Sequence, residues 1–106
     1  MRRPSSIWIV SKKYKIRFVA NLAKHSLAVG MFRWESSEIL IDDGLKGPGL
    51  AETLLHEILH AVHVTCNLQT GVDEEDIVSR LTPILLDVIR NGKNQKFWKW
   101  WKELDE

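Results

Sequence analysis

Two histidines four residues apart, with a glutamate directly after the first, are the residues of this sequence best suited to chemistry. They are His56, Glu57 and His60, in the run His56-Glu57-Ile58-Leu59-His60. On an α-helix, residues four apart lie one turn above each other, so both imidazoles can reach one zinc ion at about 2.0–2.1 Å. A glutamate beside that pair can take a proton from a metal-bound water and pass it to a leaving amine. The pattern therefore predicts a hydrolytic zinc site.

The alternative is a pair of surface histidines on an ordinary amphipathic helix. From average residue usage, the five-residue pattern should occur by chance in well under ~1% of chains of this length. Apart from Glu57, the segment from Thr53 to Leu68 is apolar or weakly polar almost all round. Such a segment predicts a buried helix, and buried histidines need polar partners. We therefore favour metal binding.

A catalytic zinc takes three protein ligands and keeps one position open for water. His63 shares the histidine face, but about 10.5 Å of helix rise separates it from His56, so we expect it to line the site. The acidic run at residues 73–76 is a better source of the third ligand. Helical projection places Glu74 near the middle of the apolar stripe that follows, and Glu75 about 100° to one side. The alternative is that all four acids are solvated residues of a helix start.

The elements that must position these residues follow from the pattern of apolar residues. Short β-branched or alternating runs predict strands, and longer runs without glycine or proline predict helices. Glycine and proline at residues 47–49 predict a break before the first long helix, and Pro83 a bend in the second. Residues 21–29 are either a short helix or a loop. The predicted strands are 7–10, 14–19, 30–34 and 38–41, and the predicted helices are 50–66, 73–90 and 94–104.

This order, strands first and helices after, predicts an α+β fold. We expect an N-terminal antiparallel or mixed sheet of three to four strands, packed on the helix that carries His56 and His60. The second long helix and the C-terminal helix complete the other layer. A length of 106 residues fits one domain, spanning residues 1–106.

Composition narrows the functional classes further. Fifteen basic and fourteen acidic residues leave a net charge of +1, which gives no general argument for binding nucleic acid or a membrane. The single cysteine, Cys66, excludes an intrachain disulfide. The apolar run Ile7–Val10 is too short for the core of a signal peptide or for a bilayer span. We therefore expect a cytoplasmic protein.

On its His-Glu helix, the chain resembles the zincin metallopeptidases, and in particular the small HExxH proteins of phages and mobile elements. The residues that carry the resemblance are Thr53-Leu54-Leu55-His56-Glu57-Ile58-Leu59-His60-Ala61, preceded by Glu38-Ile39-Leu40-Ile41 and followed by Glu74-Glu75-Asp76-Ile77-Val78. The similarity extends loosely from about residue 30 to 91, and only the His-Glu helix is specific. The chain lacks the third histidine of secreted zincins.

The resemblance implies a small zincin-like domain, a Zn²⁺ cofactor and a protein or peptide substrate. It places the third metal ligand at Glu75, which we prefer, with Glu74 as the alternative. It also implies that strand 38–41 is an edge strand that borders the cleft and pairs with an extended substrate. Ile39 and Ile41, together with His63, are then the expected substrate-binding residues.

The expected function is zinc-dependent hydrolysis of peptide bonds, with Glu57 as the general base. His63 or Tyr14 could help to stabilise the oxyanion. The alternative is a catalytically weak or inactive zincin-fold protein of phage or mobile-element origin, which binds or inhibits another protein. Fold alone does not decide between them.

The C-terminal segment alternates lysines with aromatic residues from Lys93 to Lys102. Its aromatics have the spacing of a helix that docks Phe97, Trp98 and Trp101 on the core and exposes the lysines. A patch that binds a protein partner is the alternative. Such a segment can also bind nucleic acid or a membrane surface, but we expect neither here.

Overall fold

In the computed structural model of the chain, the structure describes residues 3–66 and 74–104, and of residues 66, 74–79 and 82 it describes the backbone alone. Four strands precede the long helices, as predicted. They are β1 (Ser6–Ile9), β2 (Lys12–Val19), β3 (Gly30–Arg33) and β4 (Glu38–Asp42). The chain is therefore an α+β domain.

The strands form one mixed sheet in the order β1-β2-β4-β3. The β1–β2 and β3–β4 pairs are antiparallel, while β2 and β4 run parallel, with Ile16 beside Ile39. A short helix, α1 (Leu22–Ser26), lies in the connection from β2 to β3. The predicted alternation holds in β2, where Tyr14 and Ile16 are buried and Lys13, Lys15 and Arg17 are exposed. Alternate residues of a strand point to opposite faces, so one face of the sheet is apolar.

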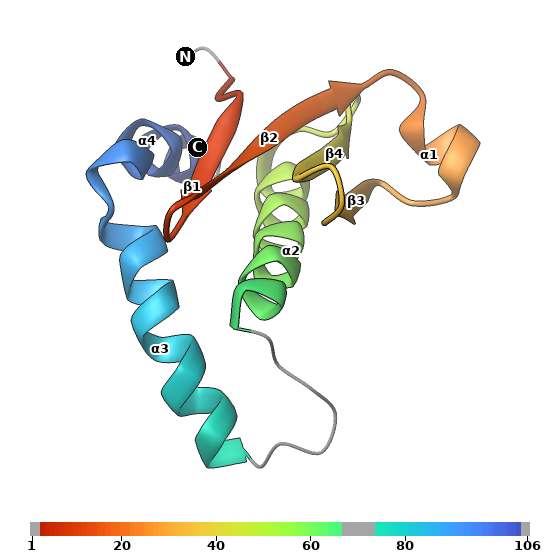
Figure 1. Ribbon diagram of the computed structural model, residues 1–106. Helices are drawn as coiled ribbons and strands as arrows, with labels where there is room; N and C mark the ends of the chain where they lie inside the picture. The colour runs from red at the N-terminus through yellow and green to blue at the C-terminus, as the bar shows by residue number, and fades with distance from the viewer. Residues whose placement is uncertain (1–2, 67–73, 105–106) are drawn as a thin grey trace.

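The helices that follow are α2 (Gly47–Cys66), α3 (Glu74–Arg90), a 3₁₀ turn η1 (Gly92–Asn94) and α4 (Gln95–Glu103) (Figure 1). The predicted break at residues 47–49 is wrong, because Gly47, Pro48 and Gly49 form the first turn of α2. Proline is tolerated there, since the N–H it lacks would have no partner within the helix. Within residues 3–66 and 74–104, none of the helices is both long and apolar enough to cross a bilayer.

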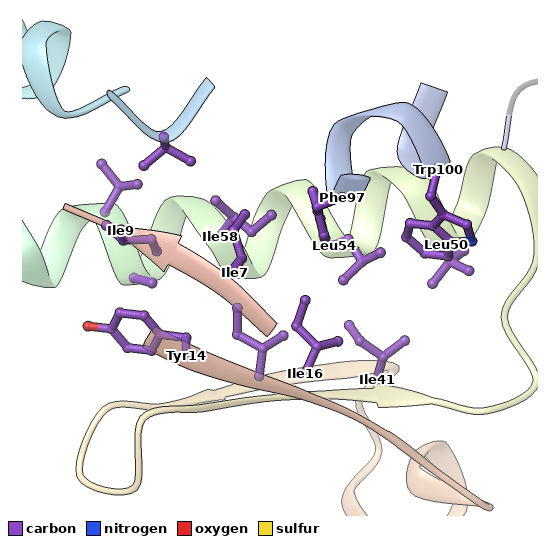
Figure 2. Packing of buried hydrophobic residues seen from close by; sticks show 14 residues of the cluster. Ile7, Ile9, Tyr14, Ile16, Ile41, Leu50, Leu54, Ile58, Phe97 and Trp100 are labelled. Atoms are coloured by element: carbon purple, nitrogen blue, oxygen red, sulfur yellow. The ribbon is translucent and has the colours of Figure 1, made fainter. Parts of the chain in front are cut away.

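The core lies between the apolar face of the sheet and one face of α2. Figure 2 shows Tyr14, Ile16 and Ile41 pointing from the sheet towards Leu50, Leu54 and Ile58 of the helix. Ile7, Ile9, Ile39, Ile41, Leu54 and Val62 are all fully buried. Burial of apolar surface on this scale is the main stabilising contribution in a domain of this size.

The C-terminal helix docks on this core, as predicted. Phe97 and Trp100 are buried, and Trp98 and Trp101 pack against the cluster from its rim. The indole N–H of Trp98 donates to the carbonyl of Val88 at 2.9 Å, and that of Trp101 to the carbonyl of Ala51 at 3.0 Å. Trp98 and Trp101 therefore connect α4 to α3 and to α2 through hydrogen bonds.

Candidate metal centre

Two histidine rings converge on the surface of α2. Nε2 of His60 lies 3.1 Å from Nε2 of His56, and the ring planes are inclined by 79°. For an ion about 2.05 Å from each nitrogen, this separation corresponds to an N–metal–N angle of about 98°, close to tetrahedral. The helix spacing of four residues places the two side chains one above the other, and their orientations bring the two nitrogens together. His56 and His60 can therefore serve as two ligands of one metal ion.

The surroundings of these histidines differ from the expectation. Leu54, Ile58 and Val62 are buried, but His56 and His60 are exposed, and so is Leu59 on the same side. The prediction that α2 is buried all round is therefore wrong, because the sheet covers one face of the helix only. Burial gives no argument that the histidines need a metal. The convergence of their Nε2 atoms is the argument that remains.

Glu57, between these exposed histidines, is itself buried, with 6% of its surface exposed. Burial, the largest influence, raises the pKa of the Glu57 carboxyl, while the side chains of His56 and His60 act in the opposite direction. A carboxylate in a poorly hydrated place is a stronger base than one in water. Among the described acidic side chains, Glu57 is the one buried group, and it lies on the helix turn that carries both histidines.

The carboxylate of Glu57 packs against β3. A Cβ atom placed on Gly30 would lie 2.9 Å from Oε2 of Glu57 and 2.7 Å from Cγ2 of Thr53, both closer than real Cβ contacts. Gly30 is therefore the residue that lets β3 approach α2 so closely. Sequence reasoning missed it, although a glycine inside a strand is a known signal of a close approach.

A cleft of about 480 Å³ opens at this contact between α2 and the start of β3. Both sides contribute to it, and Glu57 and His56 lie on the helix side. The lining residues are Leu27, Ala28, Val29, Gly30, Glu52, Thr53, His56 and Glu57. The cleft therefore brings the proposed base and one candidate ligand to a space that a substrate can enter.

The far wall of the cleft is held by Asp42, at the end of β4. Its carboxylate accepts hydrogen bonds from the backbone N–H groups of Gly44, at 2.9 Å, and Ala23, at 3.1 Å. These backbone donors, Gly44 first, lower the pKa of the Asp42 carboxyl. Ala23 belongs to α1, and the segment after α1 lines the cleft, so Asp42 fixes that segment to the sheet.

The strand that carries Ile39 and Ile41 is not at the edge of the sheet. β4 is paired on both sides, with β2 and β3, and both isoleucine side chains are fully buried. The expectation of an edge strand at residues 38–41 is therefore wrong, and these two side chains belong to the core rather than to a substrate-binding surface. The error arose because the parallel pairing of β2 with β4 leaves no local trace in the sequence.

The edge beside the cleft is β3 instead. Within the described residues β3 pairs with β4 alone, and the N–H of Asp42 donates to the carbonyl of Val29 at 2.9 Å. In an antiparallel ladder, hydrogen-bonded pairs alternate with non-bonded pairs. In this register, the backbone N–H and C=O groups of Gly30 and Phe32 point away from β4, to the open edge.

The opposite edge, β1, is closed by a side chain. The Asn94 amide accepts from the N–H of Trp8 at 2.8 Å and donates to its carbonyl at 2.7 Å, and it also donates to the carbonyl of Val88. Asn94 thus occupies the place of a neighbouring strand. β3 is left as the edge at which a further strand can pair.

The remaining predicted site residues are Glu74, Glu75, His63 and Tyr14. The side chains of Glu74 and Glu75 lie outside the described residues, and Figure 1 shows the start of α3 beyond the C-terminal end of α2. His63 is exposed on α2, and Tyr14 is buried beside Phe32. Among the described residues, no group of three or more His, Cys, Asp and Glu side chains is placed to hold a metal.

Comparison of the chain with models of protein families, with curated proteins and with solved structures gave no match.

Proposed function

We propose that the chain is a zinc-dependent peptidase in which His56 and His60 bind the ion and Glu57 is the general base. One observation carries the proposal. The two Nε2 atoms lie 3.1 Å apart, close enough for one metal ion to bind both, and the buried carboxylate of Glu57 beside them lines a cleft. Histidines and a glutamate that do not act together would not be expected to show both features, converging ring nitrogens and a buried carboxylate beside a cleft.

Zinc, when bound, polarises a peptide carbonyl and lowers the pKa of its own water towards neutrality. Glu57 then takes the proton of the attacking water and delivers it to the leaving amine. The raised pKa of Glu57 suits this role, because burial makes the carboxylate a stronger base than it would be in water.

The substrate, in this proposal, is an extended peptide that pairs with the open edge of β3. The backbone N–H and C=O groups of Gly30 and Phe32 point to this edge, and a Cβ atom on Gly30 would overlap the Glu57 side chain. Pairing through the main chain is a common mode of peptide binding and places no demand on the substrate sequence. It would hold a scissile bond beside the general base.

The third ligand in this proposal is Glu75, with Glu74 as the alternative. Both stand in the first turn of α3, directly after the connection from α2. A carboxylate is a suitable partner for two imidazoles at a catalytic zinc site, since three protein ligands leave one position for water. Glu75→Ala and Glu74→Ala, compared for zinc affinity, separate the two.

The test is the zinc content of the purified protein, measured by elemental analysis. We expect about one zinc per chain for the wild type and loss of zinc in His56→Ala and in His60→Ala. His63→Ala is the matched control, since it removes an exposed histidine from the same helix and should keep the zinc. Absence of zinc in the wild type, even after incubation with the ion, would contradict the proposal.

Activity is tested separately, with Glu57→Gln. This variant should retain zinc, because the substitution leaves both histidines in place, and should lose cleavage of an unfolded protein substrate. Loss of a general base typically costs about 10²–10⁴-fold in rate. Full activity in zinc-loaded Glu57→Gln would exclude the mechanism and leave the metal site standing.

A binding protein without peptidase activity is the second candidate. An apolar hollow of about 600 Å³ between α2, α3 and α4 favours it, since hollows lined by tryptophan and leucine often receive a partner. Leu55, Ile89, Trp98 and Trp101 are among its lining residues. Absence of cleavage by a chain that carries stoichiometric zinc would favour this candidate.

A further inference from the structure

The net charge of +1 conceals a strong separation of charge along the chain. Residues 1–34 contain eight lysines and arginines and no aspartate or glutamate. All fourteen acidic residues follow, from Glu35 onward. Residues 1–34 supply three of the four strands, and most of these cations belong to the strands.

The positive side chains of β2 lie on the outer face of the sheet. Lys13, Lys15 and Arg17 are exposed, and they alternate with Tyr14 and Ile16, which are buried towards α2. Successive side chains on one face of a strand stand about 6.7 Å apart. The three cations therefore form a row with regular spacing along one strand.

Neighbouring elements extend this row. Trp8 lies beside Lys13 in the β1–β2 register and faces outward, since Ile7 and Ile9 are fully buried on the inner face. Nζ of Lys93, from η1, lies 4.0 Å from the centre of the Trp8 ring. Towards the other edge of the sheet, Glu38 of β4 pairs with both Lys15 of β2 and Arg33 of β3. Arg33 therefore lies on the same face as Lys15.

The acidic residues on this face have partners. The register places Glu38 and Asp42 there, and Arg17 donates to the Glu38 carboxylate at 3.0 Å. The Asp42 carboxylate accepts two backbone N–H groups at the end of β4. Among the described residues, no ion pair involves Lys13, Lys15, Arg33 or Lys93.

No long helix of the described residues covers this face. Figure 2 shows α2 and α4 on the side to which Tyr14, Ile16 and Ile41 point, with the sheet as the other layer. In the described part of the chain, the large exposed apolar side chains lie in turns, loops and helices, outside the strands. The β2 part of the outer face is therefore charged and accessible, while Leu40 of β4, which the register places beside Arg17 on the same face, is buried.

We propose that this cationic sheet face, formed by Lys13, Lys15, Arg17, Arg33 and Lys93 with Trp8, binds a single-stranded nucleic acid. A line of regularly spaced cations matches a backbone that carries one phosphate per nucleotide. Cations that neutralise phosphates supply affinity, and an aromatic side chain among them offers a base a surface for stacking. An anionic membrane or an acidic protein offers no such regular repeat of phosphates along a line.

The binding test uses the full chain and a fluorescein-labelled oligothymidine, followed by fluorescence anisotropy at several salt concentrations. With three or four phosphate contacts, log K should fall with log salt with a slope of about −2 to −3. The double variant Lys13→Glu/Lys15→Glu should weaken binding about tenfold or more. Both positions are exposed, and Lys13→Gln/Lys15→Gln provides a milder pair that should weaken binding less.

The matched control is Lys96→Glu/Lys99→Glu, which makes the same charge change at exposed positions of α4. This variant should bind like the wild type. Trp8→Ala should lose about fivefold or more in affinity, and Trp8→Phe should recover most of it, because a phenyl ring can still stack.

Three results would overturn the proposal. One is the absence of binding near physiological salt. Another is an equal loss of affinity in the α4 control, which would show a general effect of net charge. The third comes from competition. It is displacement of the labelled oligothymidine by polyglutamate, phosphatidylserine vesicles or duplex DNA as effectively as by unlabelled oligothymidine, at equal concentrations of negative charge. That result would show a surface for polyanions in general.

Discussion

The side chain of Glu57 occupies the space that Gly30 leaves empty. A Cβ atom on Gly30 would lie 2.9 Å from Oε2 and 3.2 Å from Cγ of that glutamate. The glycine belongs to the open edge strand and the glutamate to the helix of the candidate metal centre. Their contact sets the distance between the general base of our proposal and the strand at which a substrate would pair.

Gly30→Ala should therefore damage the centre without touching a ligand. The added methyl must displace Thr53 or Glu57, which we expect to destabilise the fold by about 1–3 kcal/mol. It should lower the rate of peptide cleavage while zinc binding is kept. Gly49→Ala is the control, because a Cβ there meets nothing within 4 Å and alanine suits a helix better than glycine. Equal stability of Gly30→Ala and wild type in urea would contradict this account.

Burial of Glu57 predicts a specific dependence of stability on pH. The folded state holds the proton of this carboxyl more tightly than the unfolded state, since burial raises its pKa. Stability of the metal-free protein is then reduced as the pH rises from the ordinary glutamate pKa through the raised value. Glu57→Gln removes this loss.

The measurement is urea unfolding of metal-free wild type and Glu57→Gln across a pH series. The variant should be the more stable of the two at neutral pH, and the two curves should meet in acid, below the ordinary pKa of glutamate. A difference that does not change with pH would show that the burial of Glu57 has no effect on its titration.

Local patterns in the sequence predicted the core of the candidate centre. The spacing of His56 and His60 on a helix places both imidazoles on one face, one turn apart, so that their Nε2 atoms can meet. The alternation of Tyr14 and Ile16 with lysines likewise identifies β2 and its inner face. These features depend on residues within one turn or one strand, which is why they could be predicted.

Features that depend on distant residues could not be predicted in the same way. Ile39 and Ile41 lie inside the sheet because β4 pairs with both β2 and β3. Their partners in β2 are more than ten residues away along the chain. The contact of Gly30 with Glu57 depends on how β3 packs against α2. Which face of α2 is exposed likewise depends on where the sheet lies. The apolar composition of α2 describes the helix but not its neighbours.

The Asp42 carboxylate predicts the opposite pH dependence. Its pKa is lowered by the N–H groups of Gly44 and Ala23, so the stability it contributes is present above the ordinary aspartate pKa and is lost as the pH falls through the lowered value. Asp42→Asn should be less stable than wild type at neutral pH, with a difference that shrinks in acid. The cleavage rate should also fall, since α1 and the cleft wall lose their attachment.

Asp87→Asn is the control for that experiment, because Asp87 is exposed on α3, away from the cleft. Its unfolding curve should follow the wild type at every pH. If Asp42→Asn and Asp87→Asn behaved alike, the two backbone hydrogen bonds of Asp42 would contribute nothing measurable to the position of α1.

Asn94 should be the most costly polar side chain to remove. It is 1% exposed and bonds both backbone groups of Trp8 and the carbonyl of Val88. Asn94→Ala would leave these groups without partners in a site closed to water, which we expect to cost about 2–4 kcal/mol of unfolding free energy. Gln95→Ala removes an exposed amide that bonds the carbonyls of Ile89 and Asn91, and should cost under about 1 kcal/mol.

Hydrogen exchange distinguishes the loss of this edge from general destabilisation. In Asn94→Ala, the Trp8 amide should exchange faster than the amides of β2 and β4, since its partner is gone while the rest of the sheet remains paired. The same variant should bind zinc like the wild type, because η1 and β1 lie outside the candidate centre. Uniform acceleration of exchange across the whole sheet would show that Asn94 supports the fold as a unit and not the β1 edge in particular.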